Sequence, residues 1–239
     1  MTGTLINIAA VLVGTAVGTT LGARLPDGLQ QRVMAGLGMI TLVIGVDLAL
    51  AWGREGTTDH TSLYVLSGLL VGGAVGELIG IERRLEAFGR LAQRRLAANN
   101  SESRVAEGFV DASLLFCVGS LAVVGSIQDG LTGDYQTLAT KAVLDGFAAV
   151  ALSAGLGWGV GLSTLSILLV QGTITLGAGF FDDVLQGEAL AAMTSAGGIT
   201  IIGIGLKLLA LKDVKVGNFL PALVFAPAFV GLAHLVGVG

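Results

Sequence analysis

The stretch that decides the fold is AVLDGFAAVALSAGLGWGVGLSTLSILLVQGTITLGAGFF, residues 142–181, which contains one charged residue, Asp145. A helix that crosses a membrane needs about 20 apolar residues, so this run is about twice the length of one crossing. The glycine-rich segment at 155–161 is where we expect the chain to turn. We therefore predict two membrane helices, near 141–158 and 162–181. The alternative is a seven-span fold in which 142–181 is partly re-entrant.

The composition of the whole chain also indicates that it lies in a membrane. Of 239 residues, 53% are hydrophobic and 13% are charged, there are 38 glycines, and the mean hydropathy is +0.84. Soluble domains have roughly 25% charged residues. A soluble globule cannot bury this much apolar surface, which excludes a soluble enzyme. The net charge of −4 gives no basic surplus for binding nucleic acid. We predict an all-α, polytopic membrane helix bundle.

The remaining apolar runs bring the predicted number of transmembrane helices to about eight, in one transmembrane domain over residues 1–239. The six further spans lie near 2–22, 33–52, 61–81, 106–126, 189–210 and 217–237. If eight spans alternate in direction, the first gap, the third gap and the end of the seventh span face one side. These three places hold 11 of the 13 basic residues, so this side is predicted to be cytoplasmic and both termini to lie outside. The arginine-rich segment 82–105 becomes a cytoplasmic connector that meets anionic headgroups.

A repeat supports internal duplication. VGTAVGTTLG at 13–22 and VGGAVGELIG at 71–80 are identical at six of ten positions, and each has glycine at every fourth residue. On a helix these glycines form one face that lets a neighbouring backbone approach closely. Helix packing is the plain interpretation of these glycines, and such a face could also serve a homo-oligomer.

Charged side chains within the predicted spans need a reason, because each costs roughly 2.5–3.5 kcal/mol at the middle of a bilayer on insertion scales. Asp111 and Glu77 are predicted toward the inner side, and Asp145 toward the outer side. Lys141 precedes Asp145 by four residues, so the two side chains share a helix face and can pair. This pair could be purely structural.

Neutral polar residues complete a candidate path. The amide of Gln171 needs more hydrogen-bond partners than its own helix supplies, and Asn7 shares a face with the glycines of its span. The double glycine 197–198 is expected to loosen its helix and free backbone carbonyls. The predicted path consists of Asp111, Glu77, Cys117, Ser120, Gln171, Thr175, Gly197, Gly198, Lys141, Asp145 and Asn7.

Several stretches resemble the YdfK/YqgA-like family of bacterial inner-membrane proteins, also called domain of unknown function 554. They are LLFCVGSLAVVGSIQDGLTGD at 114–134, Lys141 with LDG at 144–146, Gln171, the glycines 197–198, NFLPAL at 218–223, GTLINIAAVLVG at 3–14 and GELIG at 76–80. The resemblance covers essentially the whole chain. It implies a multi-span protein of the bacterial inner membrane, but it implies neither a substrate nor catalytic residues.

These observations predict a small transporter or channel that moves a cation or a proton-coupled small solute. The expected partners are the bilayer and that solute or ion, not nucleic acid, and no cofactor is expected. The first alternative is a membrane scaffold whose buried acids are structural. An intramembrane enzyme is the second alternative. The chain lacks the motifs H-E-x-x-H, G-x-S-x-G and the P-loop, so we predict that it is not an enzyme.

Overall fold

The computed structural model describes residues 1–23, 26–54, 56–84, 87, 91, 104–117 and 120–236. It is an all-α polytopic helix bundle, as predicted. The chain divides into two compact units. Unit 1 comprises Met1–Leu37, Arg83–Cys117 and Leu121–Ala178, and unit 2 comprises Gly38–Glu82, Val118–Ser120 and Gly179–Gly239. The predicted basic connector, 82–105, lies mostly outside the described residues.

Within the described residues, six helical segments are long and apolar enough to cross a membrane, or seven if one bent helix pair counts as a span. Many of their large apolar side chains point outward: Leu78, Leu176 and Leu235 are each at least 80% exposed. Outward apolar side chains are what a hydrocarbon solvent requires, because a helix already satisfies its own backbone polar groups. One of the six segments is Gln136–Leu176, with 41 residues. The count of eight spans stays a prediction.

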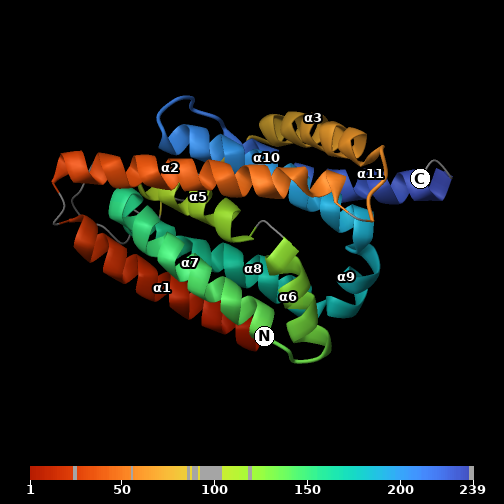
Figure 1. The fold of residues 1–239 in the computed structure, drawn as a ribbon, viewed down its shortest axis with the longest axis horizontal. Helices are drawn as coiled ribbons and strands as arrows, with labels where there is room; N and C mark the ends of the chain where they lie inside the picture. The colour runs from red at the N-terminus through yellow and green to blue at the C-terminus, as the bar shows by residue number, and fades with distance from the viewer. Residues whose placement is uncertain are drawn as a thin grey trace. The chain divides into compact units, whose positions relative to one another are not determined.

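Unit 1 is built on the pairing of α1 (Thr2–Gly22) with α7 (Gln136–Leu156), which run side by side in Figure 1. Three glycines of α1 lie against the α7 backbone, in the order Gly14 to Gly146, Gly18 to Val150 and Gly22 to Ala154. The two helices are therefore parallel. A Cβ at any of the three glycines would overlap a backbone oxygen of α7, so the first glycine stripe has the close-packing role that its spacing predicts.

The long apolar run does turn where the glycines predicted. After α7 the backbone of Gly157 takes a φ of 79°, which is readily available to glycine. A 3-10 segment, η2 (Gly157–Leu162), then leads into α8 (Ser163–Leu176). Gly161 lies against Thr15 of α1 and Gly172 against Met1. Since α8 is antiparallel to α1 while α7 is parallel to it, the chain runs along α1 and back.

The predicted span 106–126 is wrong as one straight helix. The structure has α5 (Val105–Cys117) and α6 (Ser120–Leu131), which are bent by 62° relative to each other. Within unit 1, α6 packs on the beginning of α7 and on the end of α8. Its Gly125 lies against Leu138 of α7, and its Gly130 lies against the carbonyl of Thr175 of α8. Residues 118–119, between the two helices, lie outside the described part.

Unit 2 is made of two antiparallel helix pairs. The helices are α2 (Asp27–Ala49), whose first part belongs to unit 1, η1 (Leu50–Gly53), α3 (Thr61–Ile79), α9 (Ala178–Val184), α10 (Gly187–Leu208), η3 (Val216–Phe219) and α11 (Ala222–Val236). In the first pair, Gly38 and Gly45 of α2 lie against Leu209 and Ile202, at the end of α10 and within it. The second pair joins α3 to α11 and η3.

The second glycine stripe lies in the α3 pairing. Gly68 and Gly72 of α3 lie against Ala226 and Ala222 of α11, and Gly76 lies against Asn218 of η3. Both stripes thus admit a neighbouring backbone, although the partner is parallel in unit 1 and antiparallel in unit 2. Within each unit the helix directions are those that eight alternating spans require. Internal duplication itself stays a prediction.

The turn at η2 gives a direct test of the span count. In a background with Cys117 replaced by serine, we expect Trp158→Cys to react with a membrane-impermeant thiol reagent from the cytoplasmic side only. Asp182→Cys should react from the other side only, because eight spans place these two positions on opposite faces of the membrane. A re-entrant 142–181 would leave Trp158→Cys unreactive from the cytoplasmic side, and that result would exclude eight spans.

Candidate functional site

A layer of buried polar groups crosses unit 1, and it begins with an ion pair on α7. Lys141 and Asp145 are 5% and 8% exposed, and the Lys141 ammonium contacts Asp145 Oδ2, as their spacing predicted. Asn7 of α1 donates from Nδ2 to the same Oδ2 at 3.0 Å. The prediction that Asn7 points at a neighbouring helix is therefore confirmed. Asp145 takes both bonds on one oxygen, which leaves its Oδ1 open among the described residues.

The end of α5 supplies a backbone group to this layer. Phe116 lies next to Cys117, the last described residue of α5. Lys141 Nζ donates to the carbonyl oxygen of Phe116 at 2.7 Å. The lysine thus bonds a backbone carbonyl of α5 close to the place where α5 and α6 bend away from each other by 62°. This is the discontinuous-helix arrangement that membrane proteins tolerate where protein or a wet cavity covers the break.

Gln171 on α8 completes the layer. It is fully buried, and neither Nε2 nor Oε1 has a hydrogen-bond partner among the described residues. Two contacts fix its level along unit 1: Ser166 Oγ lies 2.9 Å from Ser113 Oγ of α5, and Gly172 lies against Met1 of α1. These contacts place Gln171 level with the end of α5 and the beginning of α1. We call Asn7, the Phe116 carbonyl, Lys141, Asp145 and Gln171 the polar layer.

Further hydroxyl groups of unit 1 also lack partners. Thr4 and Thr15 of α1 and Thr175 of α8 are buried, and their Oγ1 atoms make no hydrogen bond within the described part of the chain. The amide oxygen Oδ1 of Asn7 is likewise open. A buried polar atom without a partner costs about 1–3 kcal/mol. Several such atoms in unit 1 indicate groups that something other than the described residues satisfies.

The other predicted path residues of unit 1 lie at different levels. Asp111 is fully buried on α5, but it lies closer to Gly108, which packs on Leu156 and Val160 at the far end of the unit. Cys117 is half-buried at the end of α5. Thr175 lies one turn beyond Gln171. The side chain of Ser120 lies outside the described part.

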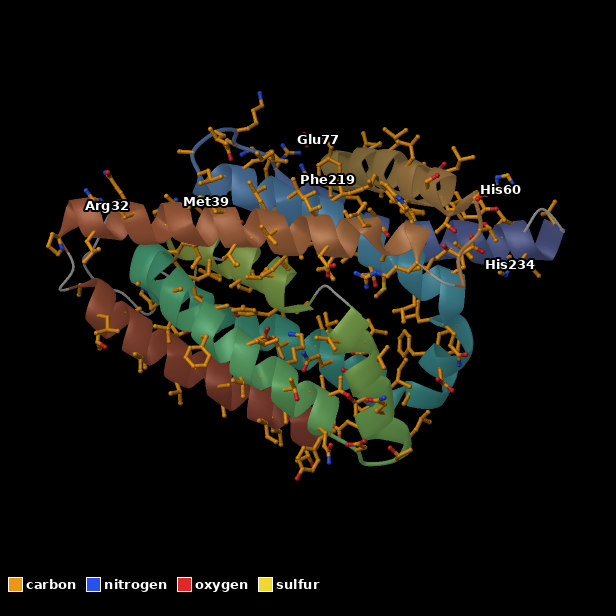
Figure 2. The ribbon with its side chains drawn as sticks, in the orientation of Figure 1. Arg32, Met39, His60, Glu77, Phe219 and His234 are labelled. Carbon is orange, nitrogen blue, oxygen red and sulfur yellow. The ribbon has the colours of Figure 1, made fainter. Side chains whose placement is uncertain are left out.

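Glu77 belongs to unit 2, where its carboxylate connects α3 to η3 by a hydrogen bond. Asn218 donates from Nδ2 to Glu77 Oε2 at 2.5 Å, and its Oδ1 accepts from the backbone N–H of Glu82 at 2.8 Å. Glu82 in turn accepts from the N–H of Gly217 at 2.6 Å. Figure 2 shows Glu77 beside Phe219 at this end of the unit, and His60 and His234 at the other end. A path that joins Glu77 to the polar layer stays a prediction.

The expected helix break at Gly197-Gly198 is wrong. α10 continues from Gly187 to Leu208 through both glycines. Gly198 lies against the backbone of α2 at Leu48 and Ala49, where a Cβ would overlap the chain. The double glycine therefore serves helix packing, and its carbonyls remain within α10. The sequence pattern for the two roles is the same, because small residues permit both.

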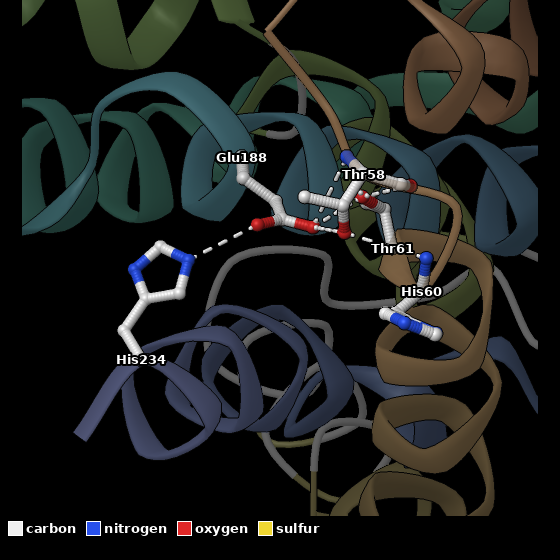
Figure 3. A network of polar contacts seen from close by, with 5 residues as sticks. All are labelled: Thr58, His60, Thr61, Glu188 and His234. Carbon is white, nitrogen blue, oxygen red and sulfur yellow. Dashed lines mark hydrogen bonds and ion pairs between the residues drawn. The ribbon is translucent and has the colours of Figure 1, made fainter. Parts of the chain in front are cut away.

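Sequence reasoning missed the buried carboxylate of Glu188, at the start of α10. As Figure 3 shows, its Oε1 accepts from the hydroxyls of Thr58 and Thr61, at 2.6 and 2.5 Å, and its Oε2 lies 3.2 Å from His234 Nε2. Glu188 is 6% exposed. In the sequence it stands just before an apolar run, away from every residue that it contacts. The three partners come from distant parts of the chain, which the sequence does not bring together.

Comparison with known proteins places the chain in a family. A family model described as "Protein of unknown function (DUF554)" matches residues 2–231. The chain belongs to this family. It is 29% identical to "Uncharacterized membrane protein YdfK" of Bacillus subtilis (strain 168), over 100% of this chain and 99% of that protein. It is 28% identical to "Uncharacterized protein YqgA" of Escherichia coli (strain K12), over 94% of each. No solved structure matches.

The unsatisfied amide predicts an unusual response to mutation. Gln171→Leu should raise the free energy of unfolding, by about 1–3 kcal/mol, because leucine fills a similar volume without two unpaired polar atoms. Lys141→Met should lower it by about 3–5 kcal/mol, because Asp145 then keeps a buried charge without its partner. Thermal unfolding of the purified protein in detergent compares the two. If Gln171→Leu is destabilised as much as Lys141→Met, the amide has a structural partner.

Proposed function

We propose that the protein is a small transporter or channel that carries a cation or a proton-coupled small solute through unit 1. The observation that supports this most is Gln171, a fully buried amide without a hydrogen-bond partner in the described part of the chain, in the same layer as a buried ion pair. In a helix bundle that binds no ligand, a buried amide without a partner only destabilises the fold. A bundle that binds a passing solute needs polar atoms that are open when the solute is absent.

The chemistry of the layer suits passage rather than catalysis. Lys141 and Asp145 form a charged pair that can be opened and remade, and the Phe116 carbonyl holds the lysine in place. Buried ionisable groups in membrane helices that line a wet interior commonly mark ion pathways or proton relays. Among the described residues, no three histidine, cysteine, aspartate or glutamate side chains gather as metal ligands. The layer also lacks a nucleophile paired with a base, which an enzyme would need.

We propose the bacterial inner membrane as the setting, which the family resemblance implies, with both chain ends outside, an orientation that follows from the basic residues of the sequence. In this orientation the polar layer lies nearer the outer face, since Asn7 is close to the beginning of α1 and Lys141 to the beginning of α7. The path inward would pass Asp111 on α5. A scaffold remains the alternative, in which the layer would be purely structural.

Flux measurements with a paired substitution test the proposal. The variant Lys141→Met/Asp145→Leu removes both charges together, so its fold should be retained or strengthened. In proteoliposomes, the unmodified protein should move radioactive sodium or rubidium, or shift an internal pH dye under an imposed gradient. The double variant should lose at least about nine-tenths of that flux, because the charged pair is part of the path.

Thr164→Ala serves as the control, since the Thr164 hydroxyl donates within its own turn to Gly161 at 2.7 Å. It should retain full flux. A double variant that is folded and as active as the unmodified protein would remove the polar layer from the mechanism. Absence of any ion or proton flux in the folded unmodified protein would favour the scaffold.

A further inference from the structure

We infer that the polar layer contains a binding site for a monovalent alkali cation, with Gln171 Oε1 as one of its ligands. The other ligands are Asn7 Oδ1, Asp145 Oδ1 and Thr4 Oγ1. This inference rests on the proposed function in one respect, because it names the class of ion that the same layer would pass. The binding of the ion can be measured without flux, however, so the two can fail separately.

The open atoms of the layer are mainly acceptors. Asn7 donates from Nδ2 to Asp145, so its Oδ1 is left facing the interior without a donor. Asp145 offers Oδ1 because both its bonds run to Oδ2. Gln171 adds Oε1 from the opposite helix. Carbonyl and carboxylate oxygens are the ligands that hard cations prefer.

The packing of α1 brings Thr4 to the same place. Thr4 precedes Thr15 by three helical turns, so the two share one face of α1. Thr15 lies against Gly161, just before α8, and Met1 lies against Gly172. Between these two contacts, Thr4 is level with the turn of α8 that contains Gln171. Its hydroxyl is fully buried and has no partner in the described part, so its oxygen is open to a ligand.

The charges of unit 1 favour a cation over an anion. Among its described side chains, three aspartates and one lysine are buried, namely Asp111, Asp129, Asp145 and Lys141; Asp129 pairs with the Met1 ammonium at 2.9 Å and Asp145 with Lys141. The described residues of unit 1 thus offer an anion no buried cation that is free of a carboxylate partner. The lysine is already engaged by Asp145 and the Phe116 carbonyl. An anion would therefore have to approach open carboxylate and amide oxygens.

The donor set fits a single positive charge better than two. Ca²⁺ takes six to eight oxygen ligands, commonly with several carboxylates, and Mg²⁺ retains several waters. Here one carboxylate oxygen is joined by neutral amide and hydroxyl oxygens, and no cluster of three acidic, histidine or cysteine side chains is found in the described residues. Neutral oxygens that replace a hydration shell are also how potassium filters hold their ion.

Binding of sodium and potassium to the purified full-length protein tests the inference. The protein is held in a choline chloride buffer, and NaCl or KCl is added at constant ionic strength while the thermal unfolding midpoint is followed. A bound ion stabilises the folded state in proportion to the logarithm of its concentration above Kd. We expect saturable stabilisation by at least one of the two salts, and none by further choline.

Three variants assign the site. Gln171→Leu should raise Kd at least tenfold, while Gln171→Glu should keep or lower Kd, because a carboxylate oxygen is a stronger cation ligand than an amide oxygen. Ser113→Ala, which alters a satisfied hydroxyl pair elsewhere on α5, should leave Kd within about twofold. The Gln171→Leu protein is expected to be well folded, so a loss of binding in it is not a loss of fold.

The inference is overturned if neither salt stabilises the folded unmodified protein, or if Gln171→Leu binds the ion as tightly as the unmodified protein does. It is also overturned if Gln171→Glu abolishes binding in a folded protein, which would indicate that the amide N–H donors contact the ligand. Flux of a solute or of protons without alkali-cation binding would leave the proposed function standing and remove only this site.

Discussion

Inside a membrane, every buried polar atom has to find a partner in the protein or in trapped water, because the lipid offers none. Unit 1 meets this requirement for the charged contact itself, since Lys141 and Asp145 Oδ2 are bonded to each other, to Asn7 and to the Phe116 carbonyl. It does not meet it for Gln171, whose two polar atoms have no partner among the described residues. That difference between a bonded ion pair and an unsatisfied amide in one layer is the basis of the functional account.

The layer depends on how closely the helices approach one another. Gly14 and Gly18 let the α1 backbone touch α7, and this contact brings Asn7 within hydrogen-bonding distance of Asp145. The turn at Gly157 then returns α8 along α1, which carries Gln171 to the same level. The glycines therefore act indirectly, since they set the distances across which the polar side chains meet. A larger residue at Gly18 would separate the helices and the layer together.

Local and periodic features were predictable from the sequence. Hydropathy located the apolar spans, glycine spacing predicted the α1–α7 face, and the four-residue interval predicted the Lys141–Asp145 pair. The sequence did not predict the bend between α5 and α6, because the span 106–126 is uniformly apolar enough to cross in one piece. It also misassigned Gly197-Gly198, whose small size fits a break or a close contact equally well. Glu188 was missed because its three partners are joined only by tertiary packing.

The central claim is that the polar layer is wet, or occupied by an ion, rather than sealed and dry. Solid-state NMR in lipid bilayers can measure magnetisation transfer from water to the side-chain amide nitrogen of Gln171, assigned by its disappearance in Gln171→Leu. The account predicts rapid transfer to this side-chain amide, comparable with transfer to the side-chain amides of exposed glutamines. It should be much faster than transfer to the backbone amide of the buried Leu152. Transfer as slow as that to Leu152 would contradict it, because the layer would then be closed to water and to any hydrated ion.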